Sequence, residues 1–497
     1  MKRHVAYIRA VVTTVSVILV VAIFATVQNY DNVVMAQGAR PAANQRTQRP
    51  ATAQATNSTR AAATQEERAT TTSAQSANQE EEQKLSPEEE ALYQDALAKF
   101  NRQDFNGALE TLKTLAKGNP AARPPRLIMA RWFSELQNAQ AVRVCLEMAT
   151  EENPDDPEAY FSLAEIALRE GALTACELLC ERGEIALAKY NANPTRQKNL
   201  THAALTVKLA YSNARQRWTN AQQTIAALIK LDGETPELMR AYARTLFQQN
   251  QFDQARNAFL RAEKLPNDQG LPADAAMAQL YAAKGDAENA KRSLDAALAA
   301  NPKSTPVLLL SISNALNEND LDSAWELVRK LYAEDKSVDV LKTYGKVALF
   351  RGDYRSAEAA FQEAVRQKPL DSDATGGLAL ALCEQNDQEK TKRAVQYAAS
   401  NLQKQSNNRD FLATLGWTLY KSGQVEEATK VLQQSIADGQ INAASAYYFA
   451  VILNEKGQTD AARQLLTAAL ATRPPFAKRA AAQALLQSLA APTNAAN

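Results

Sequence analysis

The sequence predicts an all-α fold made of short helical hairpins that repeat along the chain. Aromatic residues make up 6% of the 497 residues, and glycine occurs only 16 times. The sequence lacks the alternating runs of Val, Ile, Thr or aromatic residues that half-buried β-strands need. A chain of this length would ordinarily divide into several domains, but a repeat array grows in one dimension without a thicker core. We therefore expect a helical solenoid.

The clearest hairpin lies between residues 338 and 369. Its first half places apolar and small residues at i, i+3, i+4 and i+7, the spacing of one helix face, at Leu341, Tyr344, Gly345 and Ala348. Gly352 and Asp353 then break the pattern. The helical spacing resumes at Ala357, Phe361, Ala364 and Val365, and Pro369 follows as a residue that stops a helix. Two short helices joined by a turn are expected here.

Small residues of this hairpin recur along the chain, and most of their spacings lie within one residue of 34 or of twice 34. The small residue of the first helix recurs at Ala243, Ala278, Gly345, Gly416 and Ala450. That of the second helix recurs at Ala255, Ala290, Ala324, Ala357, Ala428 and Ala462. A hairpin this short cannot bury both faces alone, so neighbouring copies must cover one another. About eleven such periods fit between residues 89 and 474.

A 34-residue period with this pattern resembles the tetratricopeptide repeat (TPR) family over nearly four-fifths of the chain. The resemblance implies an all-α, right-handed TPR solenoid of antiparallel helix pairs. The best copies begin at Leu271, Val338, Phe411 and Ala446. Three stretches fit the repeat poorly and are expected to be longer or irregular helix pairs: residues 181–230, 308–331 and 371–405.

Residues 1–36 read as an export signal or membrane anchor. The basic start MKRHVAYIR precedes an uncharged apolar run, AVVTTVSVILVVAIFATV, which predicts that everything after it crosses the membrane. Two outcomes remain open, because the run is short for a spanning helix and long for a signal peptide. Removal after Ala36 would leave the array periplasmic, whereas retention would anchor it to the inner membrane with the repeats outside the cytoplasm.

The rest of the chain divides into three parts. Residues 37–86 are rich in Ala, Gln, Thr, Asn and Arg, and are expected to form a disordered linker. Residues 87–475 form the predicted TPR array, which begins at the capping sequence around Ser86 and Pro87. Residues 476–497 hold a C-terminal capping helix and a tail, since the open end of a stack needs a cover.

Composition and charge disfavour both nucleic-acid binding and catalysis. The net charge of +1 and the absence of a basic stripe with interleaved aromatics argue against nucleic acid as a partner. His202 is the one histidine beyond the export segment and is expected to be structural. Cys145, Cys176 and Cys180 read as small core residues, although a disulfide among them remains open in an oxidising compartment. We therefore expect no enzyme activity, no cofactor and no metal site.

The family resemblance implies a concave groove lined by the first helices of successive repeats. Positions beside the core stripe point into that groove and are candidate binding residues: Arg240, Arg244, Lys342, Lys346, Trp417, Tyr420 and Tyr447. The alternative is that the basic residues are only solvated and that the aromatics fill gaps between repeats. The set of Lys and Asn residues that clamps a terminal carboxylate in the chaperone-binding members of the family is not found.

These features predict a noncatalytic scaffold that binds peptides or partner proteins in the cell envelope. The alternative is a secretion or envelope-assembly accessory protein that binds polysaccharide or transport machinery, because aromatic side chains suit sugars as well as peptides. An enzyme with an unfamiliar site is disfavoured by the scarcity of histidine and cysteine. Membrane contact is expected only through the N-terminal segment, if that segment is uncleaved.

Overall fold

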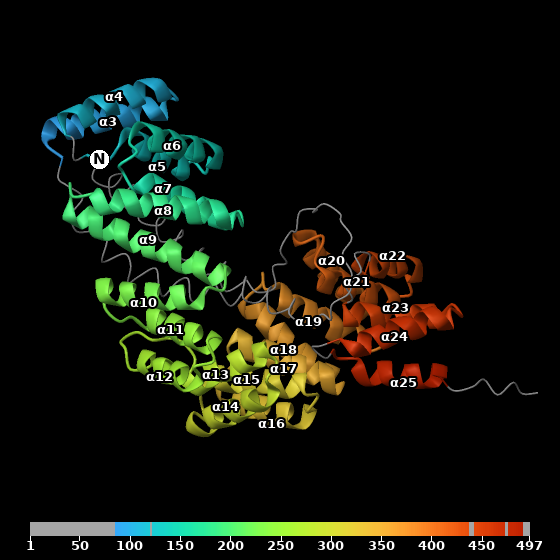
Figure 1. Ribbon diagram of the computed structural model, residues 1–497. Helices are drawn as coiled ribbons and strands as arrows, with labels where there is room; N and C mark the ends of the chain where they lie inside the picture. The colour runs from blue at the N-terminus through green and yellow to red at the C-terminus, as the bar shows by residue number, and fades with distance from the viewer. Residues whose placement is uncertain (1–84, 120–121, 437–441, 473–475, 491–497) are drawn as a thin grey trace, which may run out of the picture. The chain divides into compact units, whose positions relative to one another are not determined.

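The computed structural model describes residues 85–119, 122–436, 442–472 and 476–490, and these residues form 23 α-helices and no strands (Figure 1). The predicted all-α repeat architecture is confirmed for this part of the chain. The expected export segment, residues 1–36, and nearly all of the expected linker, residues 37–86, lie outside the described residues. Of the described helices, none is both long enough and apolar enough to span a membrane.

The chain divides into two compact units, residues 1–287 and 288–497. The first unit contains five antiparallel helix pairs and one further helix: α3 (Pro87–Asn101), α4 (Phe105–Gly118), α5 (Pro125–Glu135), α6 (Ala139–Glu152), α7 (Glu158–Arg169), α8 (Leu173–Lys189), α9 (Pro194–Ala214), α10 (Trp218–Asp232), α11 (Pro236–Gln248), α12 (Phe252–Ala262) and α13 (Ala273–Lys284). Within it, each pair packs on the next along the chain.

The second unit repeats the same arrangement. Helix α14 (Ala287–Ala300) begins at its border, five pairs follow, and one helix ends the unit: α15 (Thr305–Asn317), α16 (Leu321–Glu334), α17 (Val338–Arg351), α18 (Tyr354–Gln367), α19 (Ser372–Cys383), α20 (Gln388–Lys404), α21 (Arg409–Lys421), α22 (Val425–Ile436), α23 (Ala443–Glu455), α24 (Thr459–Ala471) and α25 (Arg479–Ala490). Helix α25 packs on α24, as expected of a cap.

The turn inside each hairpin is encoded by local chemistry. Gly352 ends α17 with φ 76°, a left-handed conformation that glycine adopts without a steric cost. Asp353 then caps α18, where its carboxylate accepts a hydrogen bond from the Ser356 N–H at 3.1 Å. In other repeats Asn residues take the left-handed position, for example Asn250 and Asn319. The break predicted at Gly352 and Asp353 is thus confirmed.

The small repeat residues lie where helices cross. Ala243, Ala255 and Ala357 are fully buried, and Gly345 is buried as well. At Gly183 of α8 an added Cβ atom would lie 2.5 Å from the ring of Phe161, and at Gly416 of α21 it would lie 2.5 Å from Leu432. Large side chains therefore fill the space that the small residues leave, as close packing requires.

Two of the three stretches that fit the repeat poorly contain long helices. Helix α9 has 21 residues and α20 has 17, whereas the helices of most repeats have 11 to 15. Helices α15 and α16, from the stretch around residues 308–331, have the ordinary lengths of 13 and 14 residues. Of the three stretches expected to be longer or irregular, the first and third thus contain longer helices, whereas the helices of the second have ordinary lengths.

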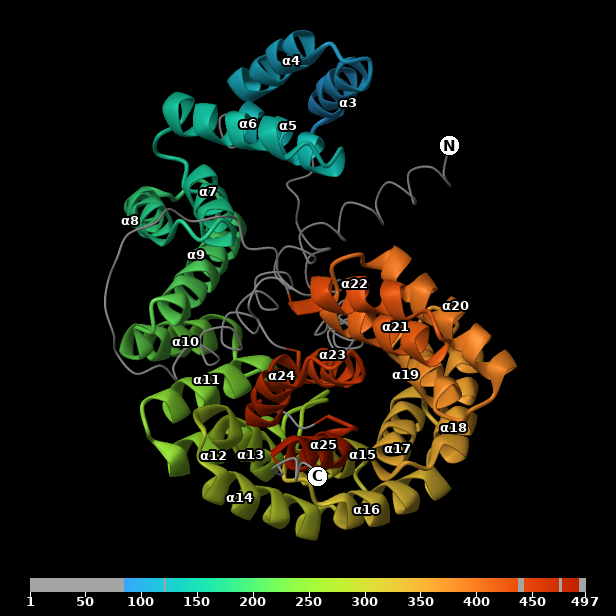
Figure 2. The ribbon, with the colours of Figure 1, turned by 90° about the vertical axis from the view of Figure 1, so that its right-hand side faces the viewer.

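In unit 2 the first helix of each pair faces the inner side of the unit. Consecutive first helices, such as α17, α19, α21 and α23, pack directly against one another, whereas consecutive second helices do so much less. Elements that lie closer together are on the concave side of a curved stack, and α15 and α17 indeed lie inside α16 and α18 in Figure 2. The first helices of unit 2 thus carry its groove face.

Candidate functional site

The groove face of unit 2 carries a row of carboxylates at the starts of three successive first helices. Asp339, Asp373 and Asp410 occupy the first turns of α17, α19 and α21, at sequence spacings of 34 and 37 residues, and all three are exposed. We call them the acidic rim. An aspartate in the first turn is favoured because the positive end of the helix dipole lies there. Because the hairpin repeats, the same preference places these carboxylates side by side.

Asp373, at the middle of the acidic rim, is exposed but lies close to other charged side chains. Its side chain is reached by solvent, yet burial by surrounding protein raises its pKa above the ordinary value. The negative charges of Asp371 and Asp410 raise this pKa further, and Lys342 and Lys346 oppose the shift. A carboxylate that is accessible but crowded by like charges gains from an incoming cation.

Lys342, one of the predicted groove cations, is held by carboxylates of its own unit. Its Nζ atom lies 3.1 Å from Asp371 Oδ2 and 3.3 Å from Asp339 Oδ1. Burial acts to lower the pKa of Lys342, but the charge of Asp371 and the hydrogen bond to it raise the pKa overall. Lys342 therefore neutralises a buried aspartate and has little charge left for a ligand.

Arg240, in unit 1, is engaged in the same way. Its guanidinium donates hydrogen bonds to both carboxylate oxygens of Asp268 and, at 2.9 Å, to the Leu271 carbonyl. The side chains of Arg240 and Asp268 are only 12% and 9% exposed. A Cβ atom added to Gly270 would lie 2.1 Å from the guanidinium carbon, so the loop before α13 wraps closely over it. This is an ion pair that holds a loop.

The remaining two cations of the prediction are Lys346 and Arg244. Lys346 is exposed on α17, and its charge acts on Asp373 of the acidic rim. Arg244 is half-buried on α11. Arg240 and Arg244 belong to unit 1 and the two lysines to unit 2. In each unit at least one predicted cation, Arg240 or Lys342, is paired with an aspartate that lies just before the next first helix.

The aromatic residues of the prediction lie together at the end of unit 2. Trp417 is 5% exposed and stacks on Tyr448 with a centroid distance of 4.3 Å, and it also stacks on Tyr420 at 5.1 Å. Tyr447 is 8% exposed, and the Tyr420 hydroxyl donates to the Glu455 carboxylate. These rings fill the space between α21 and α23, so Trp417 and Tyr447 offer no open platform for a sugar ring.

A buried carboxylate joins this aromatic cluster, and the sequence alone did not reveal it. Glu384, directly after α19, is 8% exposed in its side chain and accepts a hydrogen bond from Trp417 Nε1 at 2.7 Å. Lys421 Nζ lies 3.6 Å from the other carboxylate oxygen, and Lys478 Nζ lies 2.8 Å from the first. The signal that could have indicated the acidic rim is the repeated Asp at helix starts. Glu also recurs at the C-cap of first helices, at Glu170, Glu318 and Glu384, but the burial of Glu384 depends on Trp417 and Lys478 of later repeats.

Catalytic chemistry finds no support among the described residues. His202 Nδ1 lies 2.6 Å from Asp232 Oδ2 on the surface of unit 1, as a structural pair. Cys145, Cys176, Cys180 and Cys383 are buried free thiols, so the disulfide that the sequence left open is not formed. Within the described ranges no three His, Cys, Asp or Glu side chains come together as a metal site.

Comparison with known families matches this geometry. A family model described as tetratricopeptide repeat matches residues 213–272, 345–391 and 414–478, and a second one with the same description matches residues 275–304. The chain is a tetratricopeptide repeat protein. Tetratricopeptide arrays use their extended concave surfaces for binding, which makes this one a protein interaction scaffold.

Individual relatives of this tetratricopeptide protein are distant. A TPR repeat-containing protein of Pseudomonas aeruginosa is 25% identical over 192 residues, or 38% of this chain. The chain spans about a third, 32%, of the length of that relative.

Two solved structures show a similar arrangement over part of the chain. A tetratricopeptide repeat protein from Parabacteroides merdae is 11% identical, covering 58% of this chain and 98% of its own, with a TM-score of 0.35. Yeast Tom70 is 14% identical, covering 81% of this chain and 95% of its own, with a TM-score of 0.32.

Proposed function

We propose that this tetratricopeptide protein binds an extended, basic segment of a partner protein along the first helices of unit 2. The observation that carries the proposal is the acidic rim, in which Asp339, Asp373 and Asp410 are exposed on three successive first helices. A partner in extended conformation would meet one carboxylate per repeat. Complementary charge would guide the encounter and make it sensitive to salt.

The cations Arg240 and Lys342, taken alone, would suggest an acidic partner, but the partner proposed here is basic. Both are paired with aspartates of their own unit, Asp268 and Asp371, and neither adds a free positive charge to a groove. Lys346 remains exposed beside the acidic rim, where its charge acts on Asp373. The groove face of unit 2 therefore favours a cationic ligand, with Lys346 available for an occasional acidic side chain.

The site of action that we propose is the cell envelope. The basic segment MKRHVAYIR and the apolar run after it support export, and the partner would then be an exported protein or a component of transport machinery. A polysaccharide ligand is less favoured, because Trp417 and Tyr447 are buried instead of presenting their faces. The array would act by binding and not by catalysis.

Affinity capture with the full-length chain tests this proposal. The tagged chain is expressed in the native cell, cross-linked, purified and compared by mass spectrometry with the variant Asp339→Asn/Asp373→Asn/Asp410→Asn. A partner that binds the acidic rim should be recovered at least tenfold less with this variant and less at high salt.

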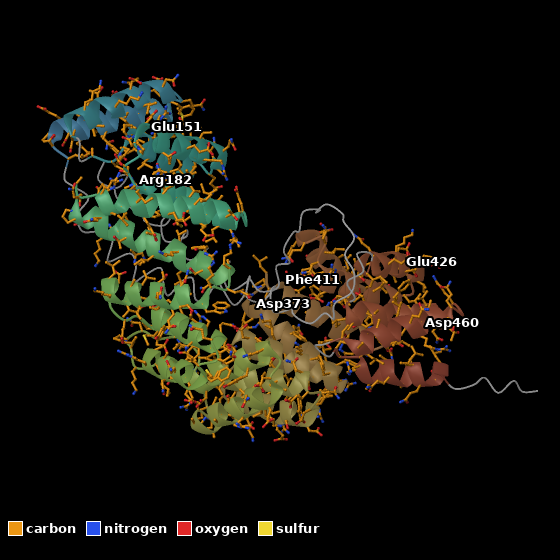
Figure 3. All side chains as sticks on the ribbon, in the orientation of Figure 1. Glu151, Arg182, Asp373, Phe411, Glu426 and Asp460 are labelled. Atoms are coloured by element: carbon orange, nitrogen blue, oxygen red, sulfur yellow. The ribbon has the colours of Figure 1, made fainter. Side chains whose placement is uncertain are left out.

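A matched control changes the same number of carboxylates on second helices. Glu426, Glu427 and Asp460 are exposed on α22 and α24. Glu426 and Asp460 lie on the opposite side of unit 2 from Asp373 in Figure 3. Exchange of all three residues for Gln, Gln and Asn should leave capture unchanged. Equal loss of the partner in both triple variants, or in neither, would show that the acidic rim is only a solvated edge.

A further inference from the structure

The segment just before the last helix reaches back across the groove face of its own unit. Lys478 Nζ donates a hydrogen bond to the Tyr354 hydroxyl at 2.7 Å, across a sequence separation of 124 residues. Tyr354 is the first residue of α18, whereas Lys478 directly precedes α25. In a repeat array each hairpin ordinarily contacts only its neighbours. This contact spans several repeats, so stacking of neighbouring hairpins does not account for it.

The Lys478 side chain contacts a carboxylate and an aromatic ring that together suit a cation. Its ammonium group lies 2.8 Å from Glu384 Oε1 and 5.0 Å from the centre of the Tyr354 ring. Trp417 Nε1 donates to the same Glu384 oxygen at 2.7 Å. We call the set Tyr354, Glu384, Trp417 and Tyr447 the lysine pocket. Aromatic walls and a carboxylate with little solvent access form a strong environment for an ammonium group.

Phe476 fills the apolar part of the same pocket. It is buried, and its ring lies 5.9 Å from that of Tyr447, which in turn lies 6.1 Å from Trp417. Tyr447 and Trp417 occupy the positions on α23 and α21 that face the groove in this family. Phe476 and Lys478 are two residues apart in a turn that is closed by a hydrogen bond from the Arg479 N–H to the Phe476 carbonyl, and both side chains contact this cluster.

The contacts of Lys478 with Tyr354 and Glu384 come in addition to the packing of α25 on α24. The cap covers α24 through Leu485, Leu486 and Leu489, which pack against the core of unit 2. Phe476 and Lys478 contribute contacts to α18, α19 and α23 that a cover for α24 does not need. The chain therefore supplies an aromatic and a basic side chain to its own groove.

We propose that the lysine pocket is a binding site for a partner segment with an aromatic residue followed two positions later by lysine, and that Phe476 and Lys478 occupy this site in the free protein. A partner segment of the same pattern displaces them. The proposal rests on the proposed use of the groove face of unit 2, and it specifies the partner. The acidic rim shares α19 and α21 with this pocket: Asp373 and Asp410 lie in the first turns of these helices, whereas Glu384 follows the last turn of α19 and Trp417 lies in the second half of α21.

A peptide copied from the chain itself serves as the probe. The fluorescein-labelled peptide covers residues 472–482, and its binding is measured by fluorescence anisotropy with the full-length protein. The variant Phe476→Ser/Lys478→Ser opens the pocket while leaving the leucines of α25 in place. This variant should bind the peptide at least tenfold more tightly than the unmodified protein, because nothing needs to be displaced.

Three further measurements assign the binding to the pocket. A peptide with Glu in place of Lys478 should not bind the opened variant. Adding Glu384→Gln to that variant should abolish binding of the original peptide, whereas adding Glu426→Gln, an exposed change on α22, should preserve it. Tyr354→Phe removes one hydrogen bond without changing packing and should weaken binding several-fold.

Circular dichroism and thermal unfolding establish that each variant is folded. If the double variant is not folded, Lys478→Met replaces it.

Two results would overturn the assignment. A folded, opened variant that binds the peptide no more tightly than the unmodified protein does would show that the segment is only a structural brace. A concentration-dependent dimer formed by exchange of this segment, without binding of added peptide, would assign the pocket to a second copy of the chain. Capture of a partner through the acidic rim would stand in either case, since that test does not alter the pocket.

Discussion

Phe361 lies between two glycines of consecutive first helices, and an added Cβ atom at Gly377 would lie only 2.4 Å from its ring. At Gly345 the corresponding distance is 2.7 Å. Phe361 belongs to α18, whereas Gly345 and Gly377 belong to α17 and α19. The Phe361 side chain, which belongs to a second helix, therefore sets the distance between the two first helices beside it. This relationship couples neighbouring repeats and carries the first prediction.

Gly377→Ala should destabilise unit 2 by about 1 to 3 kcal/mol, because the ring of Phe361 has no room to retreat in a packed core. Gly376→Ala provides a matched control on the same helix. Its Cβ atom would lie 3.5 Å from the Asn401 side chain, an ordinary contact, so this change should be neutral or stabilising by up to about 1 kcal/mol. Urea unfolding of both variants measures the difference.

Hydrogen exchange adds a spatial test to that experiment. Since repeats couple mainly to their neighbours, Gly377→Ala should raise exchange first in α17 to α20. A uniform rise in exchange along both units would contradict the repeat-by-repeat coupling.

The Arg240–Asp268 ion pair should stabilise unit 1 through the loop that it holds. Arg240→Met leaves the Asp268 carboxylate buried without a partner, which should cost about 3 kcal/mol. The double variant Arg240→Met/Asp268→Leu removes the stranded charge and should recover most of the loss. Thermal unfolding of the single and double variants measures both the loss and its recovery. If the two variants are equally destabilised, the loss comes from packing and not from charge.

The same ion pair predicts a dependence of stability on pH. Burial acts to raise the pKa of Asp268, but the hydrogen bond and charge of Arg240 lower it below its ordinary value. A carboxylate with a lowered pKa stabilises the fold fully above its unfolded value, and this contribution is lost as pH falls through the folded one. The gap in unfolding free energy between the unmodified protein and the double variant is small near pH 7, and it should move in favour of the double variant as pH falls below about 4. A gap that stays constant from pH 7 to pH 3 would contradict the pairing.

Glu165 should make the protein less stable as pH rises. It is half-buried on α7, and burial raises its pKa to about 7 against the opposing charge of Arg169. A carboxyl group with a raised pKa binds its proton more tightly in the folded state, so stability falls between about pH 4.5 and pH 7 and is constant above.

Glu165→Gln therefore should stabilise the fold by about 1 kcal/mol at pH 8 and give no gain at pH 4. Glu181→Gln, on the exposed face of α8, is the control and should change nothing at either pH. Chemical unfolding at the two pH values provides the comparison. An equal effect of Glu165→Gln at pH 4 and pH 8 would show that Glu165 does not titrate in this range.

The four cysteines should be unreactive in the folded protein. All are buried thiols, and burial raises the pKa of Cys145 and Cys383, which reduces the reactive thiolate. A thiol reagent at pH 8 should label less than one group per native chain and four groups after unfolding without reductant. Fewer than four after unfolding would reveal a disulfide.

The fold could be predicted from local patterns because the hairpin is a local structure. The spacing of Leu341, Gly345 and Ala348 specifies a helix face, and Gly352 specifies a turn, without reference to distant residues. A period near 34 then requires stacking, since no single hairpin buries its apolar face. These features determined the helix pairs, the repeat family and the closely packed small residues from sequence alone.

The charges and aromatics of the groove were decided by tertiary structure. Arg240 and Lys342 meet their partners Asp268 and Asp371 only because the next repeat folds against them, 28 and 29 residues further along. Trp417 is buried by Tyr448 of the following repeat for the same reason.

Lys478 reaches Tyr354 across 124 residues, a contact that no repeat period encodes. The positions of the helices and the way they pack depend on which side chains share one helix face, and this pattern can be read along the chain. Whether a charged or aromatic side chain of that face remains available to a partner depends on which residues other repeats bring against it.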